Sequence, residues 1–492
     1  MPLIVADPRK IALVKEAELH LPLRPGTDVA LLMGMARVIV DQGLHDAEFL
    51  AQRCENLDAF REALADFDLD RVEEITGVPQ NDIVRAALTY ATRKPALIIY
   101  SLGITEHSHG TDNVLGLANL ALLTGNVGKP SAGVMPMRGQ NNVQGACDMG
   151  AGPGAFPGYQ SVADDELRAK FERHWGCSLP PEPGRPEVEM IQAALEGKTQ
   201  ALYCVGVDPA FTVADATRVQ EALRACEFLV FQDIFLNGSA EFADVVLPGA
   251  SYAEKDGTFT NLERRVQRVR KAIEPIGDSR PDWLITCQIA QRMGASGFDF
   301  DDPSQVLDEI GQLMPSFAGI SFDRLDDGGI QWPCPGPDHP GTPRLHVEKF
   351  NTPSGKGRLS ALAYRPPAEH ADDDYPFTLT TGRNLYHFHL AMTCRVPGLM
   401  AIYPEEEIMI NPADADELGI RTGDRVAVSS RRGRLIAKAR VTDMVAPKGS
   451  YMSFHFYDTP TNVLTQQALD PVAKTPEYKV TAIRIEKADN GG

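Results

Sequence analysis

Residues 95–125 read PALIIYSLGITEHSHGTDNVLGLANLALLTG. The first part, PALIIY, is a short apolar run of the kind that forms a buried strand. The last part, TDNVLGLANLALLTG, is almost entirely apolar and predicts a buried helix. The segment between them is polar and contains glycine, as loops do. A strand, a polar loop and a helix in this order predict one unit of a parallel α/β sheet.

The same alternation of strands and helices extends in both directions from this stretch. Before it, LIVADP (residues 3–8) and the segment near 19–23 predict strands, and several amphipathic helices follow, one of them capped by Gly77. After it, strands at 201–206, 228–235 and 243–250 alternate with helices at 214–226 and 280–294, which predicts a second α/β unit.

From residue 375 onwards the pattern changes to period two. The segments DRVAVSS, RLIAKARVTD and SYMSFHF alternate apolar and polar residues, and SRRGR (430–434) predicts a hairpin turn. We therefore predict two parallel-sheet α/β units followed by a small β-barrel. The predicted domains are 1–138, 139–345 and 375–492, with a linker at 346–374. This linker lies in a stretch, residues 326–374, that is rich in proline, glycine and aspartate.

Composition excludes several classes of function. The chain has 492 residues, 43% hydrophobic and 23% charged, with a net charge of −19, which argues against nucleic-acid or membrane-surface binding. No apolar stretch reaches membrane-spanning length, so no membrane insertion is expected, and the N-terminus lacks the features of an export signal. The eight cysteines contain no CxxC pair and signal neither a zinc nor an iron–sulfur site. We expect all eight to be buried, in a protein of the reducing cytoplasm.

Polar loops follow most of the predicted strands. ADPRK, RPGTD, LGITEHSHG, GVDPAFT and TTGRNLYHFH each come directly after a strand, and ligands of open α/β sheets bind at the carboxyl ends of strands. Their carboxylates, amides and backbone groups suit a large polar ligand such as a nucleotide. Each loop taken singly is more typical of a turn: Asp208 could cap a helix, and His387 and His389 could be barrel residues bonded within the protein.

The loop RGQNNVQGACDMGA (138–151) is the most unusual of the polar segments. It combines one cation with glutamines, asparagines and glycines, and no helical or strand periodicity runs through it. In an acidic protein, a single arginine among amides suggests a site for a small anion. Arg138 could also pair with a carboxylate such as Asp148.

Three long stretches give the chain a family resemblance: LLTGNVGKPSAGVMPMRGQNNVQGACDMGA, FQDIFLNGSAEFADVVLPGASYAEKDGTFTNLERRVQ and NVLTQQALDPVAKTPEYKV. With these the chain resembles the molybdopterin-dependent oxidoreductases of the dimethyl-sulfoxide-reductase type. Within that family it is most similar to the formate dehydrogenase catalytic (alpha) subunits, over essentially its whole length. The resemblance implies an enzyme that oxidises formate to CO2 at a molybdenum or tungsten bis-molybdopterin guanine dinucleotide centre.

The resemblance also implies roles for individual residues. Arg138 would hold formate, because a guanidinium offers a planar fork of donors to a carboxylate. The C–H bond of the bound formate could then point at the metal's sulfido ligand for hydride transfer. Gln140 would contact the pterin. The remaining cofactor contacts implied are Asp7, Gly26 and Asp28 at one guanosine, Asp208 and Thr212 at the other, and Arg383, His387, His389, Asn462, Tyr478 and Lys479 in the C-terminal barrel.

The sequence departs from the family pattern in two ways. Glu106 stands where relatives often have glutamine, and Asn237-Gly238 stands where threonine and glutamate are common. More importantly, nothing matches the family's N-terminal cysteine motif for a [4Fe–4S] cluster or the cysteine or selenocysteine, followed by histidine, that ligates the metal. The chain resembles the C-terminal two-thirds of the subunit, which implies that its first α/β unit is truncated. The cluster and the metal ligand are therefore expected only in the N-terminal segment, and none of residues 1–492 is predicted to ligate the metal.

The expected partners are formate, that N-terminal segment and electron-transfer subunits that are iron–sulfur, NAD- or hydrogenase-linked. The chain alone is expected to be inactive and prone to aggregate. Two alternatives stay open: a metal-free structural member of the family, and another molybdopterin oxidoreductase acting on a different substrate.

Overall fold

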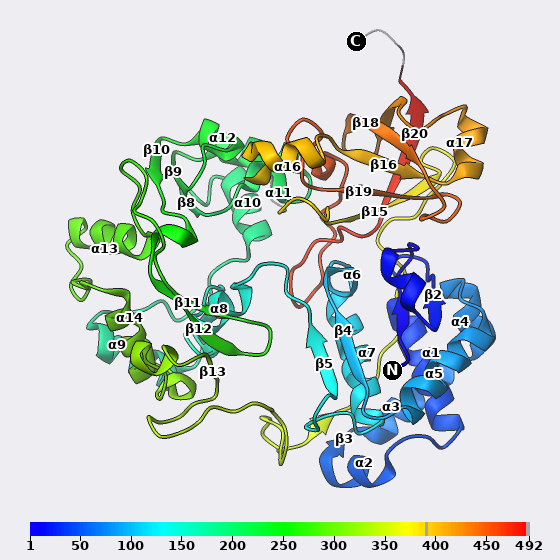
Figure 1. Ribbon diagram of the computed structural model, residues 1–492, viewed down its shortest axis with the longest axis horizontal. Coiled ribbons are helices and arrows are strands. Elements are labelled where there is room, and N and C mark those ends of the chain that lie inside the picture. The colour runs from blue at the N-terminus through cyan, green and yellow to red at the C-terminus, as the bar shows by residue number, and fades with distance from the viewer. Residues whose placement is uncertain (389–391, 489–492) are drawn as a thin grey trace. The chain divides into compact units, whose positions relative to one another are not determined.

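The computed structural model describes residues 1–388 and 392–488, which fall into two compact units (Figure 1). Unit 1 comprises residues 1–135, 209–219 and 344–492, and unit 2 comprises residues 136–208 and 220–343. The predicted domain boundaries at 138, 345 and 374 stay predictions. The boundaries between the compact units lie after residues 135 and 343, and residues 209–219 also belong to unit 1.

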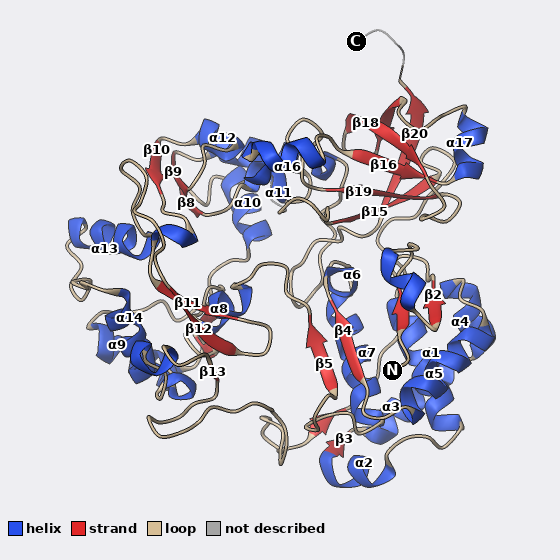
Figure 2. Ribbon diagram, viewed as in Figure 1, coloured by secondary structure: helices blue, strands red, loops and turns tan. Residues whose placement is uncertain are grey.

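Helix α1 (Asp28–Asp41) is the centre of the first part of unit 1. It is apolar over most of its surface, and Val29, Met33 and Ile39 are almost fully buried in the main hydrophobic core. It packs against α4, α5 and α7, as Figure 2 shows. The predicted cap of α4 is confirmed, since Gly77 ends that helix in the left-handed conformation with φ of +72°. The elements of residues 1–136, besides α1, are β1 (Ile4–Ala6), β2 (Leu19–Leu21), α2 (Ala47–Arg53), β3 (Cys54–Glu55), α3 (Leu57–Ala63), α4 (Leu69–Thr76), α5 (Gln80–Thr92), β4 (Leu97–Tyr100), α6 (Leu102–Thr105), α7 (Gly110–Leu123) and β5 (Gly133–Pro136).

The predicted parallel pairing of strands is confirmed, and the predicted burial of β4 is wrong. β1 and β2 pair in parallel. In β4, however, Leu97 is 43% exposed and Ile99 is 54% exposed, whereas Ile98 and Tyr100 pack on the main core. Strand side chains alternate between two faces, and β4 belongs to a sheet of only two strands with β5. Only one of its faces is therefore covered.

The C-terminal part of unit 1 is a closed barrel, as predicted. Its strand order is β15-β19-β16-β18-β17-β20. Leu379, Ile408, Val428 and Ile483 are fully buried inside it. The predicted hairpin joins β17 to β18, with Ser430 N donating to Gly433 O at 2.9 Å. The elements of residues 209–225 and 344–492 are α11 (Pro209–Thr212), α12 (Ala216–Ala225), β14 (Gly357–Arg358), β15 (Phe377–Gly382), α16 (Pro397–Ile402), β16 (Glu407–Ile410), α17 (Pro412–Leu418), β17 (Arg425–Ser429), β18 (Arg434–Val441), β19 (Gly449–Ser453) and β20 (Thr481–Lys487).

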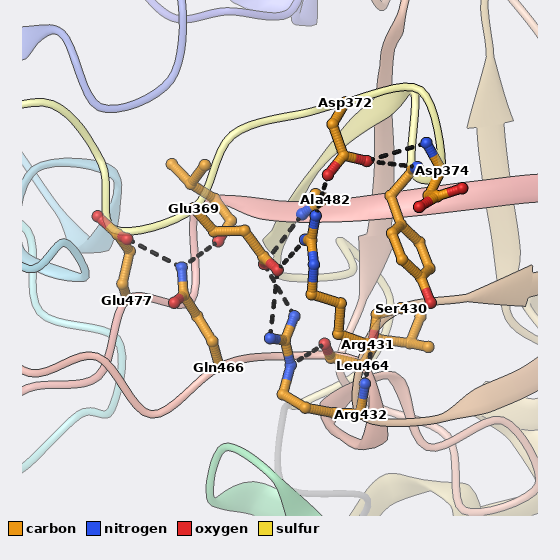
Figure 3. A network of polar contacts seen from close by, with 12 residues as sticks. Glu369, Asp372, Asp374, Ser430, Arg431, Arg432, Leu464, Gln466, Glu477 and Ala482 are labelled. Carbon is orange, nitrogen blue, oxygen red and sulfur yellow. Dashed lines mark hydrogen bonds and ion pairs between the residues drawn. The ribbon is translucent and has the colours of Figure 1, made fainter.

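A buried carboxylate ties the segment before the barrel to the barrel itself. Glu369 accepts from Arg432 Nη2 at 2.8 Å, from Arg431 Nη1 at 2.5 Å and from Ala482 N at 3.1 Å (Figure 3). Asp372, which lies in the same segment as Glu369, forms an ion pair with Arg431. The hairpin that contains both arginines is therefore anchored to residues 369–372 by charge-assisted hydrogen bonds.

Replacing Glu369 with glutamine should destabilise the barrel. The Glu369 side chain is 9% exposed, so the change removes the carboxylate that Arg432 pairs with in a poorly solvated place and leaves Arg431 paired with Asp372 alone. We expect a loss of about 2 kcal/mol in the free energy of unfolding, measured by urea denaturation. Asp374→Asn is the control, because that side chain is 86% exposed and should change stability by less than about 0.5 kcal/mol. Equal stability of the two variants would contradict the anchoring role.

Unit 2 combines a parallel sheet with an antiparallel ribbon. The sheet has the order β10-β9-β8 and is parallel throughout, which confirms the predicted second α/β unit. The ribbon β11-β12-β13 is antiparallel. The elements of residues 137–343, besides α11 and α12, are α8 (Val143–Asp148), β6 (Ala155–Phe156), β7 (Gln160–Ser161), α9 (Asp165–Trp175), α10 (Glu187–Leu195), β8 (Ala201–Val205), β9 (Phe228–Asp233), β10 (Val245–Pro248), β11 (Gly257–Thr260), β12 (Arg265–Val269), α13 (Asp282–Arg292), α14 (Pro303–Leu313), α15 (Phe322–Leu325) and β13 (Ile330–Gln331).

The cysteines are free thiols, but the expectation that all eight are buried is wrong. Cys54, Cys287 and Cys334 are buried, four others are partly exposed, and Cys177 is exposed. Cys177 follows the C-terminus of α9 in a proline-rich surface segment, which explains why no core is available to it. Across residues 1–388 and 392–488, no helix combines the length and the apolar character that a membrane crossing requires.

Candidate functional site

The Arg138 loop leads into a short helix that the sequence did not predict. Arg138 is exposed, and its Nη2 donates to Oε1 of Gln144 at 3.2 Å. Gln144 is buried in α8, and its Nε2 donates to Oδ1 of Asp148 at 2.8 Å, four residues later. The arginine thus reaches the carboxylate through an amide. A helix this short, with Gly145 inside it, has too few apolar positions to show a period.

Asp148 is a fully buried carboxylate surrounded by donors. Besides Gln144, Tyr159 Oη donates to its Oδ1 at 2.8 Å and Trp332 Nε1 donates to its Oδ2 at 2.8 Å. Its side chain is 0% exposed. Burial raises the pKa of Asp148, and the three hydrogen bonds, together with the charge of Arg138, oppose that rise.

Close backbone approach holds this segment in place. A Cβ at Gly145 would lie 2.2 Å from Oδ1 of Asn142, and that oxygen accepts from Thr260 N in β11 at 2.9 Å. Tyr159 has a φ of +59°, which is rare for a bulky residue. Backbone strain of this kind persists only where surrounding contacts fix it. The Tyr159 hydroxyl supplies such contacts, because it bonds both Asp148 and Gln144.

A buried ion pair lies in unit 1, at the loop after α6. Lys479 Nζ is 2.5 Å from Oε2 of Glu106 and donates to Thr381 O at 3.0 Å. Burial lowers the pKa of the nearby Arg383, and the charge of Glu106 opposes this change. Glu106 therefore interacts with two cations. A neutral glutamine at this position would leave both without a carboxylate, which gives this departure from the family pattern a physical reason.

A second buried charge cluster joins Asp28, at the start of α1, to the C-terminal segment. His107 lies between two carboxylates, with Nε2 3.7 Å from Oδ2 of Asp28 and Nδ1 3.9 Å from Oε1 of Glu477. Burial raises the pKa of Asp28, and His107 opposes this rise. Burial also raises the pKa of Glu477, but hydrogen bonds from His107, Ala368 and Ser108 outweigh it and leave the pKa lowered.

Three of the predicted cofactor residues come together at α11. Asn462 Nδ2 donates to Phe211 O at 3.1 Å and to Thr212 O at 3.0 Å. Tyr478 Oη accepts from Ala214 N at 3.1 Å. Segments that are some 250 residues apart in sequence therefore meet, and the C-terminal part of unit 1 holds the strand-end loop GVDPAFT at Thr212.

The other predicted residues have the following contacts. Asp208, in unit 2, is 1% exposed and accepts from N and Oγ of Ser239 at 2.9 and 2.5 Å. The ring nitrogens of His387 contact Thr393 Oγ1 at 3.1 Å and Tyr403 O at 2.7 Å. These contacts agree with the alternative that His387 is a barrel residue bonded within the protein. His389 lies outside the described residues.

The two N-terminal loops are shaped by turns. Asp7 Oδ1 accepts from Arg9 N at 2.8 Å. Gly26 has a φ of +82°, and a Cβ there would lie 2.4 Å from Cγ of Pro367, so only glycine suits the position. Gln140 is partly exposed in the loop between Arg138 and α8.

Within residues 1–388 and 392–488, the polar groups suit a large polar cofactor and form no cluster that could hold a metal ion. In this described part of the chain, the buried polar atoms without a hydrogen-bond partner include His109 Nε2, Asn113 Oδ1 and Arg383 Nε. Buried polar atoms are normally paired, and these supply both donor and acceptor positions of the kind that phosphates and a purine edge require. No cluster of three or more His, Cys, Asp or Glu that could hold a metal ion occurs among the same residues.

The sequence missed part of this site. The sequence pattern assigns no role to Gln144 or Tyr159, and it suggests Asp148 only as a direct partner of Arg138. The spacing of four residues between Gln144 and Asp148 is a local signal that could have indicated their contact. Trp332 is 184 residues from Asp148, and nothing in the sequence links the two.

Comparison with known proteins places the chain in a family. The molybdopterin oxidoreductase model matches residues 1–292, and the molydopterin dinucleotide binding domain model matches residues 377–482. The chain is 46% identical to the F420-dependent formate dehydrogenase 2 subunit alpha of Methanococcus maripaludis, over 99% of this chain and 72% of the relative. It is 44% identical to the F420-dependent formate dehydrogenase subunit alpha of Methanocaldococcus jannaschii, over 99% and 72%. It is 40% identical to formate dehydrogenase H of Escherichia coli, over 98% and 68%.

A solved structure supports the fold. Acetylene hydratase from Pelobacter acetylenicus matches with a TM-score of 0.78 at 20% identity, over 99% of this chain and 74% of that one. This likeness concerns the fold alone. The two family models and the relatives at 40–46% identity decide the family: the chain belongs to the molybdopterin oxidoreductases and resembles the alpha subunits of formate dehydrogenases.

Proposed function

We propose that this chain carries the formate-binding and pterin-binding part of a formate dehydrogenase, an enzyme that oxidises formate to CO2. The observation that supports this most is the exposed Arg138 guanidinium, held by Gln144 in an amide-rich loop, in a chain 46% identical to a formate dehydrogenase alpha subunit. Formate has almost no apolar surface, so a charged fork is the main means of binding it.

Arg138 binds and orients the substrate in this proposal. A guanidinium keeps its charge at all working pH values and offers parallel N–H donors to the two carboxylate oxygens. With both oxygens held, the C–H bond points away from Arg138. The oxidation removes this hydrogen with two electrons and leaves CO2. Because CO2 lacks the negative charge that Arg138 binds, Arg138 binds the product more weakly than the substrate.

The cofactor in this proposal is bis-molybdopterin guanine dinucleotide with molybdenum or tungsten, which supplies the acceptor for the two electrons when bound. Asp7, Gly26 and Asp28 would bind one guanosine, and Asp208 and Thr212 the other. Gln140 would contact the pterin. The barrel and C-terminal contacts would be Arg383, His387, His389, Asn462, Tyr478 and Lys479. Arg383 and Lys479 bring positive charge that suits phosphate groups.

The metal ligand and the [4Fe–4S] cluster come from outside residues 1–492 in this proposal, because the eight cysteines have no spacing that suits a cluster. Electrons leave through separate electron-transfer subunits, in the cytoplasm. F420 occurs in the names of three relatives, and the sequence alone did not single it out. Residues 1–492 purified alone should therefore show no formate oxidation.

Replacing Arg383 with methionine should lower cofactor retention. The change keeps much of the side-chain volume and removes a partly buried positive charge, and the loss of one charged hydrogen bond weakens binding by roughly 1.5–3 kcal/mol. We expect about tenfold or more weaker retention at limiting cofactor, measured as guanine nucleotide released by acid per protein. Arg425→Met is the control, since that arginine is 58% exposed and pairs with Glu405. Equal guanine content in both variants would remove Arg383 from the site.

A further inference from the structure

We propose that Gln144 and Asp148 are positioning residues that fix the Arg138 guanidinium in the plane required by a planar carboxylate. This inference rests on the proposed formate site at Arg138 and deepens it. Neither residue touches the substrate. They act through Arg138, by a chain of hydrogen bonds that runs from the exposed guanidinium to a buried carboxylate.

The first step is the orientation of the Gln144 amide. Its Nε2 has two hydrogens, and two acceptors lie within reach: Asp148 Oδ1 at 2.8 Å and Tyr159 Oη at 3.1 Å. Its Oε1 is thereby turned towards Arg138, whose Nη2 donates to it at 3.2 Å. The reverse orientation would point an NH2 group at a guanidinium, and two donors cannot bond each other.

The second step is the carboxylate that makes this orientation the only stable one. An ionised carboxylate accepts hydrogen bonds and donates none. Asp148 is 0% exposed, so water cannot replace a lost partner, and the hydroxyl of Tyr159 and the indole of Trp332 hold its two oxygens. An asparagine of the same shape would present both a donor and an acceptor, and the Gln144 amide could then turn round.

The third step is the effect on Arg138. A guanidinium has five N–H donors in one plane, and the contact with Gln144 uses one of them. Fixing that nitrogen restricts rotation of the plane, so that the remaining donors meet a planar anion with less loss of conformational freedom. An exposed arginine without such an anchor would lose more freedom each time it binds the substrate.

The experiment measures formate binding by saturation-transfer NMR of the formate C–H proton on the purified assembled enzyme, kept without an electron acceptor so that no turnover is needed. We expect Asp148→Asn and Gln144→Met each to raise the dissociation constant of formate about tenfold. Asp165→Asn is the control: its side chain is 87% exposed, and its dissociation constant should equal that of the unchanged protein.

A double-mutant cycle separates positioning from general damage to the fold. In the Arg138→Lys background there is no planar fork to orient, so adding Asp148→Asn should have no further effect on binding. The same tenfold loss in that background would overturn the positioning role. So would full formate affinity in both Asp148→Asn and Gln144→Met. If Asp148→Asn fails to fold by circular dichroism, Gln144→Met is tested in the same cycle and decides by the same outcomes.

Failure of the proposed function looks different. Formate binding that is absent in the unchanged protein, or unaffected by Arg138→Lys, would overturn the substrate site itself and the positioning role with it. Binding that needs Arg138 but is indifferent to Gln144 and Asp148 would overturn only the positioning role.

Discussion

Arg138→Lys in the assembled enzyme should lower kcat/KM for formate about 100-fold, which corresponds to about 2.7 kcal/mol of transition-state stabilisation. Lysine keeps the positive charge but replaces a planar fork by a single ammonium group. It also cannot keep the Gln144 contact at 3.2 Å and hold both formate oxygens in one plane. Most of the loss should appear in KM, because binding of the carboxylate is what the fork provides in both the ground state and the transition state.

Steady-state formate oxidation over a range of formate concentrations tests this prediction. Arg173→Lys is the matched control, since Arg173 is an exposed arginine of α9 in the same unit, and its kinetics should equal those of the unchanged enzyme. A kcat/KM for Arg138→Lys within about twofold of the unchanged enzyme would exclude Arg138 as the formate ligand.

Glu406→Gln should stabilise the barrel at alkaline pH and leave its stability unchanged in acid. Glu406 is 2% exposed, directly before β16, and burial raises its pKa from 4.5 to about 8. Its Oε1 accepts from Ser453 N at 3.0 Å and Glu407 N at 3.2 Å, and its Oε2 bonds Ser453 Oγ. A glutamine keeps these contacts, because the serine hydroxyl can accept from its amide, and it carries no charge to bury.

The pH window follows from the raised pKa. The folded protein keeps the Glu406 proton more tightly than the unfolded chain, so the contribution of Glu406 to stability is fully present below the ordinary pKa of 4.5 and is lost as the pH rises towards 8. Each pH unit in this window costs about 1.4 kcal/mol, which amounts to roughly 5 kcal/mol by pH 8–9. Glutamine at this position removes the loss.

Thermal unfolding from pH 4 to pH 9 measures the difference. The midpoint of Glu406→Gln should rise above that of the unchanged protein as the pH increases. Glu405→Gln is the neighbouring control, because Glu405 is 36% exposed and pairs with Arg425 and Lys438, so its removal should give no stabilisation at any pH. Parallel pH profiles for Glu406→Gln and the unchanged protein would show that Glu406 is ionised at little cost.

The sequence by itself determined those features that depend on neighbouring residues. The apolar spacing of α1, the left-handed Gly77 that ends α4 and the turn between β17 and β18 are local properties of the backbone and its nearest side chains. The period-two pattern likewise predicted the barrel, because alternation requires one buried and one outer face. The resemblance to a family then pointed to Arg138, which no periodicity could have done.

The tertiary structure decided what holds Arg138 and which apolar residues are covered. Asp148 is bonded by Trp332, from a segment 184 residues away, and such a contact depends on how the chain folds back and leaves no local pattern. Leu97 and Ile99 lie in an apolar run that is typical of a buried strand, yet both side chains are exposed. Their burial depends on whether another layer covers that face of the sheet. Composition fixes how favourable burial of a side chain would be, and only the packing of distant segments provides the layer that buries it.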